Sequence, residues 1–201
     1  MKYLKIISIA FFSILVLLIL YIEFGGRYIL NTTDKRIITW HIRSSEQLPT
    51  NFYNFYDIVY PNSLSDNSWN LIFNTLLNPN TQRKSCPCNQ LAYRLFLTLN
   101  TKNKSAIDYF LIARYIEHRY SQKDCLNFNF SNFDFLENRK GIKNISQSFF
   151  NKEAKDLRPL EMGEILALYE NPVKNNRNRN PERAKTRAKY FYNLYIQNSN
   201  K

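Results

Sequence analysis

The sequence predicts a mostly α-helical domain behind an N-terminal transmembrane helix. Three observations support this prediction. An almost unbroken apolar run covers residues 6–22, apolar residues recur at helical spacing from about residue 66 onward, and helix-start signals stand between these stripes. The chain has 201 residues, which is enough for one domain beyond a tether, so we expect no second large catalytic domain within them.

The apolar run is interrupted only by serines and Tyr21, and Lys2 and Lys5 precede it. A run of about 17 to 20 apolar residues can just span a bilayer. No small-residue cleavage pattern follows the run, so we expect an uncleaved anchor whose N-terminus is cytoplasmic. We therefore divide the chain into residues 1–26, the cytoplasmic N-terminus and transmembrane anchor, and residues 27–201, an extracytoplasmic domain.

Beyond the anchor, Gly25 and Gly26 indicate a flexible exit, and the β-branched run at residues 37–40 favours a short strand. The periodicity that follows is helical. The apolar faces of the predicted helices consist of Trp69, Ile72, Phe73, Leu76 and Leu77; Leu91, Ala92, Leu95 and Phe96; Ile107, Leu111 and Tyr115; Met162, Ile165, Leu166 and Tyr169; and Ala184, Ala188, Phe191 and Tyr195.

Capping residues and prolines mark the ends of these helices. Ser105 with Asp108 forms an S-x-x-D capping box, and Ser121 with Asp124 repeats it. Further boundaries are expected at Asn78-Pro79-Asn80, before Asn171-Pro172, and at Asn180, which can cap a helix opened by Pro181.

The formal net charge is +12. For an exported domain, this charge favours phospholipid headgroups and anionic envelope polymers, and we expect no nucleic-acid partner. Seven of the cations lie in residues 174–189, against the single acid Glu182. This segment is either a solvated helix face or a surface attracted to membranes or to pyrophosphate.

The three cysteines leave their pairing open. Cys86 and Cys88 are too close along the chain to bridge comfortably, so Cys125 pairs with one of them in an oxidising compartment, or all three are unpaired core residues. No second pair of thiols or nearby histidines completes a zinc site. We therefore expect neither a metal nor a cofactor.

The most specific pattern is GIKNISQSFFNKEAKDLRPLEMGEILAL, at residues 141–168. It resembles the second half of the peptidoglycan glycosyltransferase domain, family 51, of penicillin-binding proteins and monofunctional transglycosylases, which has G-I-x-x-A-(A/S)-x-x-Y-F-x-K and then D-L-(S/T)-L-x-E. The matching residues are Gly141, Ile142, Ser146, Phe149, Phe150, Lys152, Asp156, Leu157, Glu161, Ala167 and Leu168. The resemblance implies a lysozyme-like, mostly α-helical fold.

Towards the N-terminus the scaffold positions of the family still match, but the chemical positions differ. Tyr56 and Tyr109 stand where the family has its two Glu residues, and Ser105 and Ala106 replace its Arg-Lys pair. In the family, the first Glu takes the proton from the attacking 4-hydroxyl, and the second Glu and the cations serve the donor. A phenol with a pKa near 10 is a poor base at neutral pH. The resemblance therefore implies a degenerate active site.

Four further residues are candidate site residues. Asp57 and Asp108 stand one residue from the vacant Glu positions and are candidates for displaced acids, although Asp108 is better explained as the capping partner of Ser105. Gln90 matches the second Gln of the family's T-Q-Q-L-A, and it is either a contact to glycan or phosphate or a polar residue of a helix start. Lys152 is a candidate for substrate binding through its match to Y-F-x-K.

Taken together, these patterns predict a single-pass protein of the bacterial inner membrane, with its C-terminal domain outside the cytoplasm. We expect it to bind lipid II, glycan strands or cell-wall synthesis proteins without catalysis. One alternative is an active peptidoglycan glycosyltransferase with displaced acids. The other is a basic envelope scaffold that keeps only the fold, which would lack an open cleft around Tyr56, Gln90 and Tyr109.

Overall fold

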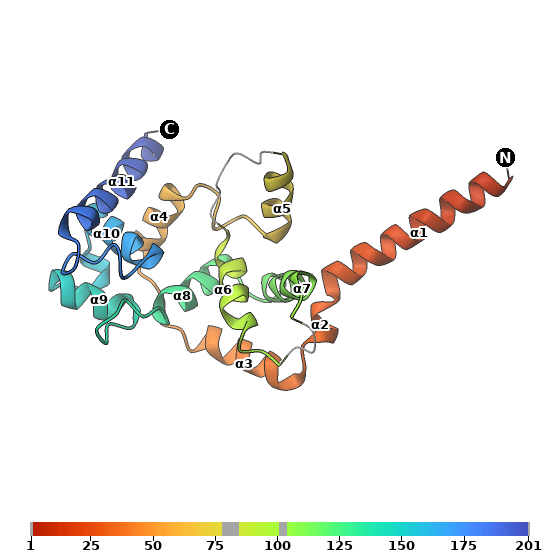
Figure 1. The fold of residues 1–201 in the computed structure, drawn as a ribbon, viewed down its shortest axis with the longest axis horizontal. Helices are drawn as coiled ribbons and strands as arrows, with labels where there is room; N and C mark the ends of the chain where they lie inside the picture. The colour runs from red at the N-terminus through yellow and green to blue at the C-terminus, as the bar shows by residue number, and fades with distance from the viewer. Residues whose placement is uncertain (1, 78–84, 101–103, 201) are drawn as a thin grey trace.

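The computed structural model describes residues 2–77, 85–100 and 104–200, which form helices and, apart from one isolated bridge between Asp134 and Lys140, no β-structure (Figure 1). The helices are α1 (Lys2–Phe24), α2 (Gly26–Ile29), α3 (Thr32–Arg43), α4 (Thr50–Val59), α5 (Ser68–Leu77), α6 (Pro87–Phe96), α7 (Ala106–Glu117), α8 (Gln122–Ser131), α9 (Gly141–Phe150), the 3-10 turn η1 (Ala154–Asp156), α10 (Pro159–Glu170) and α11 (Pro181–Ser199). The predicted mostly α-helical class is confirmed.

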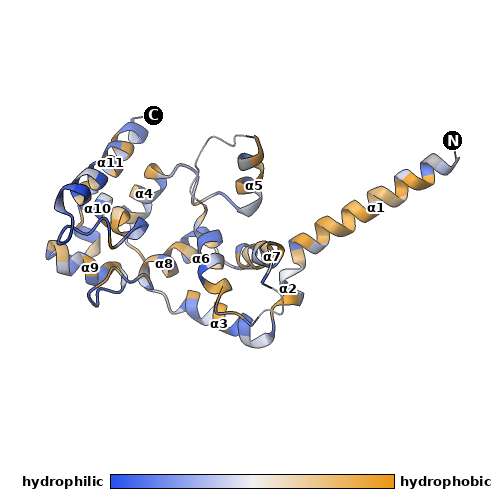
Figure 2. Cartoon of the chain, in the orientation of Figure 1, coloured by the Kyte–Doolittle hydropathy of each residue, from blue (hydrophilic) through white to orange (hydrophobic). Residues whose placement is uncertain are grey.

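Helix α1 projects away from the rest of the molecule (Figure 1). Its segment Lys5–Phe24 is long and apolar enough to cross a membrane, and none of it is buried in the protein. Figure 2 shows hydrophobic residues all round this helix, where an amphipathic helix would have a polar face. These properties are those of the anchor that the sequence predicts.

The remaining helices enclose two hydrophobic cores. The first contains buried residues of α4, α8, α9, α10 and α11, with Phe52, Tyr56, Phe130 and Ile165 at its centre. The second contains buried residues of α3, α6, α7 and α8. Helix α8 contributes to both cores, so it joins the two halves of the domain.

A disulfide bond and a buried thiol account for the cysteines. Cys88 at the start of α6 is bonded to Cys125 on α8. Cys86 is a free cysteine with 2% of its surface exposed. The pairing that the sequence left open is therefore Cys88 with Cys125.

Gly25 and Gly26 do not form the flexible exit that we expected. Both are buried against α7, and a Cβ added to Gly26 would lie 2.3 Å from the Leu111 carbonyl oxygen. Any larger residue would push the two backbones apart. The pair is thus a site of close packing where the anchor joins the domain.

The short strand expected at residues 37–40 is also wrong, because this run lies within α3. Ile38 and Ile42, one helical turn apart, are 0% and 5% exposed. Asn31 caps the helix by accepting a hydrogen bond from the Asp34 amide at 2.7 Å. Burial of one face of the helix overrides the β-propensity of the Ile-Ile-Thr run.

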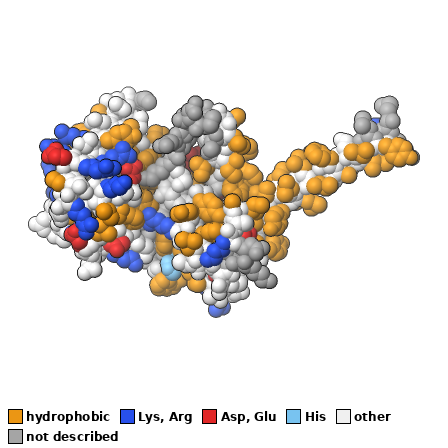
Figure 3. Space-filling model, in the orientation of Figure 1, with side chains coloured by type: hydrophobic (Ala, Val, Ile, Leu, Met, Phe, Trp, Pro, Cys, Tyr) orange, Lys and Arg blue, Asp and Glu red, His pale blue; other side chains and the backbone are white. Residues whose placement is uncertain are grey.

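Helix α5 forms where expected, but its apolar stripe is not core. Phe73, Leu76 and Leu77 are 54%, 73% and 75% exposed. Ile107 of α7, expected to be inward-facing, is 63% exposed. The boundary predicted at residues 78–80 lies outside the described residues. Figure 3 shows hydrophobic side chains covering the side of the domain that faces α1.

Most of the predicted helix ends are confirmed. Both capping boxes are present, with Ser105 and Ser121 accepting from the amides of Asp108 and Asp124. Helix α10 ends at Glu170, before Asn171-Pro172. Asn180 is the N-cap residue of α11, but its side chain makes no capping hydrogen bond, so that part of the prediction is wrong.

Candidate functional site

Tyr56, which our sequence alignment assigns to the position of the family's base, is a core residue of α4 with no exposed surface. Its ring lies 5.0 Å from that of Tyr60 and 6.2 Å from that of Phe130. Burial raises the pKa of its phenol far above the ordinary value, and the neighbouring Tyr169 adds to the rise. A side chain that neither meets solvent nor ionises near neutral pH is unsuited to general-base work.

Gln90 lies next to this core, at the start of α6. Its Oε1 accepts a hydrogen bond from the Tyr169 hydroxyl at 3.0 Å, and its Nε2 donates to the Ser85 carbonyl oxygen. Arg94, one turn further along α6, stacks over the Tyr169 ring at 4.9 Å. Gln90 therefore has protein partners for both ends of its amide, as a polar residue at a helix start would.

Tyr109, which our sequence alignment assigns to the position of the second Glu, is half-buried on α7. Its hydroxyl donates to the Asn89 carbonyl oxygen at 3.0 Å, and its ring packs edge-on against Tyr93 and Phe96. Burial raises the pKa of this phenol as well.

The two candidate displaced acids have different surroundings. Asp57 is exposed on α4. Asp108 is the capping partner of Ser105, accepting from its amide at 3.1 Å and from its hydroxyl at 2.9 Å. The capping interpretation of Asp108 is confirmed.

Lys152 is part of an ion-pair cluster at the start of α10. Its Nζ lies 2.8 Å from Oε1 of Glu161, and Arg158 donates to the same carboxylate through its backbone amide and its guanidinium. Burial alone would raise the pKa of Glu161, but these hydrogen bonds and charges outweigh it and hold the pKa at about 2. The arrangement joins the segment that follows α9 to the start of α10.

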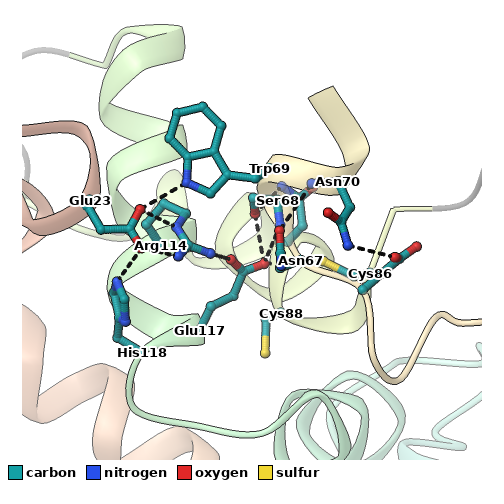
Figure 4. A network of polar contacts seen from close by, with 12 residues as sticks. Glu23, Asn67, Ser68, Trp69, Asn70, Cys86, Cys88, Arg114, Glu117 and His118 are labelled. Carbon is teal, nitrogen blue, oxygen red and sulfur yellow. Dashed lines mark hydrogen bonds and ion pairs between the residues drawn. The ribbon is translucent and has the colours of Figure 1, made fainter. Parts of the chain in front are cut away.

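Glu117, which matches a helix Glu of the family, is the centre of a buried polar network (Figure 4). Its carboxylate accepts from the amide and the hydroxyl of Ser68, both at 2.8 Å, and pairs with Arg114 at 2.5 Å. Arg114 also pairs with Glu23 at the end of α1. Glu117 therefore has a structural role in the fold.

The same network fastens the anchor to the domain. Glu23 accepts from Trp69 Nε1 at 2.9 Å and lies 2.9 Å from His118 Nε2. The His118 ring stacks on Phe24, and its side chain is 32% exposed. The sequence alone did not identify Glu23 as a partner, because 91 residues separate it from Arg114.

An open cleft of about 580 Å3 lies between the end of α4, α10 and α11. Its aromatic and apolar wall includes Tyr60, Tyr190 and Phe191, and its polar groups include Asp66 and the ion pair of Glu170 with Arg187, at 2.7 Å. Ser63 also lines it, and the Ser63 hydroxyl is buried without a hydrogen-bond partner among the described residues.

This cleft differs from the site expected from the sequence, because none of Tyr56, Gln90 and Tyr109 lines it. Neither this cleft nor a second one on the outer face of α3 opens around these three residues, as the scaffold alternative expects. The residues of the cleft between α4, α10 and α11 come from segments more than a hundred positions apart in the sequence. For this reason the sequence did not indicate that Glu170 and Arg187 lie together in one site. The apolar and aromatic lining with a few convergent polar groups is typical of small-molecule sites. Within the described residues, no group of three or more His, Cys, Asp or Glu side chains is placed to hold a metal ion.

Comparison with known proteins agrees with the fold. A sequence model of the transglycosylase family matches residues 75–195, more than half of the chain. Penicillin-binding protein 1A of Neisseria lactamica and that of Neisseria gonorrhoeae are each 30% identical over 108 residues, which are 54% of this chain and 14% of each relative. The chain thus spans a small part of the curated relatives that it matches. The resemblance inferred from residues 141–168 is confirmed, and the chain belongs to the transglycosylase family.

Proposed function

We propose that the protein is a membrane-anchored, non-catalytic member of the transglycosylase family that binds peptidoglycan strands or their lipid-linked precursor. The observation that carries this proposal is the burial of Tyr56. At the position that we align with the family's base, the chain has a phenol with no exposed surface and a raised pKa, packed among aromatic rings. The helices of the family are retained around a position that cannot perform its chemistry.

The cleft of α4, α10 and α11 is the site that we propose for glycan. Aromatic rings cover the apolar faces of sugars, and carboxylate, guanidinium and hydroxyl groups meet their hydroxyls. Tyr190 is 46% exposed and supplies such a ring at the rim, with Arg187 stacked on it at 4.2 Å. The buried hydroxyl of Ser63 offers a hydrogen bond that no described residue uses.

We also propose that α1 crosses the inner membrane and that residues 27–201 lie outside the cytoplasm. The Cys88–Cys125 disulfide supports an oxidising compartment. Trp69 links the first turn of α5 to Glu23 at the end of α1. The exposed apolar side chains of α5 therefore stand close to where the bilayer surface would be, and they suit a lipid contact.

The full-length protein in phosphatidylcholine nanodiscs should form no glycan polymer from lipid II above a heat-denatured control, yet it should bind soluble glycan fragments. Tyr190→Ala should weaken that binding about tenfold through the lost aromatic contact. Tyr93→Ala removes an equally bulky exposed ring from α6 and serves as the matched control. Binding that is absent, or equally weakened by both substitutions, would favour the scaffold alternative.

An active enzyme with displaced acids is the second candidate, and the carboxylates of Asp66 and Glu170 in the cleft favour testing it. Polymer formation that is abolished by Asp66→Asn, Glu170→Gln, Asp57→Asn or Asp108→Asn would replace the non-catalytic proposal. Circular dichroism on each variant would distinguish a lost acid from a lost fold.

A further inference from the structure

A second, shallow cleft of about 410 Å3 lies on the outer face of α3. Helix α3 lines it with Thr32, Lys35, Arg36, Thr39, Trp40 and Arg43. These positions are spaced three and one apart, so they form one stripe of the helix. Ile38 and Ile42 are buried on another face of the same helix. Tyr115 of α7 and Arg119, just beyond its end, complete the wall.

The cleft is positively charged and has no acidic side chain in its lining. Lys35, Arg36, Arg43 and Arg119 make no ion pair with any described residue. Lys35 donates to the carbonyl oxygen of Arg27 at 2.7 Å, and Arg119 stacks over the Tyr115 ring at 4.7 Å. Asp34 is the only acid on α3; it is 2% exposed and accepts from the Asn100 amide.

The cations of residues 174–189 differ from these four, because some of them form ion pairs with acidic residues. Arg177 pairs with Glu164 at 2.5 Å and Arg187 pairs with Glu170 at 2.7 Å. Charge on that segment is thus partly used within the fold, whereas the charge of the α3 cleft is not. Unpaired guanidinium groups gathered in one concavity are suited to bidentate binding of phosphate oxygens.

The α3 cleft also lies close to the end of the apolar helix α1. Tyr115 packs directly on Gly26, next to the end of α1, since a Cβ added to Gly26 would lie 2.7 Å from Tyr115 Cβ. Only the short α2 separates α1 from α3 along the chain (Figure 1). Trp40 is 67% exposed on the same stripe, and tryptophan is enriched where proteins meet lipid headgroups.

We propose that the α3 cleft is a binding site for a phosphate group, carried either by the headgroup of an anionic phospholipid or by a soluble pyrophosphate. Both ligands present phosphate oxygens, which Arg36, Arg43 and Arg119 would bind. Lys35 adds a further positive charge, and Trp40 covers the apolar part of the ligand. This site is separate from the glycan cleft and does not depend on the function proposed for it.

The test titrates inorganic pyrophosphate into full-length protein in phosphatidylcholine nanodiscs and follows tryptophan fluorescence. The chain has two tryptophans, and the response should vanish in Trp40→Phe. A triple variant, Lys35→Gln, Arg36→Gln and Arg43→Gln, should weaken binding at least about tenfold. The matched control, Lys174→Gln, Lys185→Gln and Lys189→Gln, removes the same charge from exposed residues and should bind as the parent does.

A second arm distinguishes the two sources of phosphate. Nanodiscs containing phosphatidylglycerol should produce the fluorescence change without added pyrophosphate if the ligand is a lipid headgroup, and should not if it is soluble. Either result supports the site. Equal weakening in the two triple variants, or no response to either probe, would overturn it, and a cooperative thermal transition in each variant would exclude unfolding as the cause.

Discussion

Tyr56 contributes to the packing of the fold, but it lacks the carboxylate that a general base would supply. Its ring fills the space between α4 and α8, where it contacts Phe130. A Glu at this position would have to lose its hydration or remain protonated, because no exposed surface is available. Tyr56→Glu should therefore lower the free energy of unfolding by at least about 3 kcal/mol in urea titrations.

Asp57→Asn, at the exposed neighbouring position, is the control and should change the stability by less than about 0.5 kcal/mol. Adding Tyr109→Glu to Tyr56→Glu should not restore polymerisation of lipid II, because Ser105 and Ala106 still lack the family's cations. Unchanged stability of Tyr56→Glu would mean that this position is open to solvent.

Glu161 should make the stability sensitive to acid. Its folded-state pKa is about 2, against an ordinary value of 4.5. Because the folded pKa is lowered, the stabilisation is complete above pH 4.5 and is lost as the pH falls towards 2. The contribution is roughly 2 kcal/mol after allowing for the exposure of Lys152 and Arg158. Urea unfolding at pH 7, 4 and 3 should show this loss, and Glu161→Gln should flatten it.

The residue scale also shows what the sequence can predict. Ser105 and Asp108 lie three positions apart, so their capping box follows from local geometry alone. Gln90 and Tyr169 are 79 positions apart, and their hydrogen bond depends on how α6 and α10 pack. Local geometry could therefore be predicted from the sequence, but the packing and burial of residues far apart in the chain could not.

At the scale of the element, the sequence could predict that a segment is a helix, but it could not predict what covers the helix's apolar face. The stripe of α10 is buried, with Ile165 and Leu166 at 0% exposure, whereas the similar stripe of α5 is exposed. Periodicity specifies that a helix has an apolar face, but it does not say whether protein or lipid covers that face. The strand predicted within α3 failed for a related reason, since burial of Ile38 and Ile42 outweighs local propensity.

The disulfide between α6 and α8 should be a major source of stability. It closes a loop of 37 residues, which corresponds to about 3 to 4 kcal/mol by the chain-entropy estimate. Cys88→Ala with Cys125→Ala should lose this amount in urea unfolding, while Cys86→Ala should lose much less. Alkylation in denaturant should label one cysteine before reduction and three after it; labelling of all three before reduction would contradict the pairing.

At the scale of the whole molecule, the anchor and the domain form a continuous structure. Gly26 packs on α7, and Glu23 binds Arg114, Trp69 and His118. The end of α1 is thus fixed by close packing and by a buried ion-pair network (Figure 4). A rigid junction of this kind would hold the domain at one orientation to the bilayer, with α9 and α10 at the end of the domain opposite α1 (Figure 1).

The orientation that we propose across the membrane rests on the flanking charges and gives the last prediction. Lys2 and Lys5 precede α1 and favour a cytoplasmic N-terminus. We therefore expect activity from a reporter that is fused after Lys201 and works only outside the cytoplasm. Replacing both lysines with glutamine, and adding three lysines after Phe24, should reduce that activity because the charge bias is reversed. If the parent chain instead gave activity only with a reporter that works in the cytoplasm, the proposed orientation would be contradicted. The domain would then have no access to peptidoglycan, on which the proposed function depends.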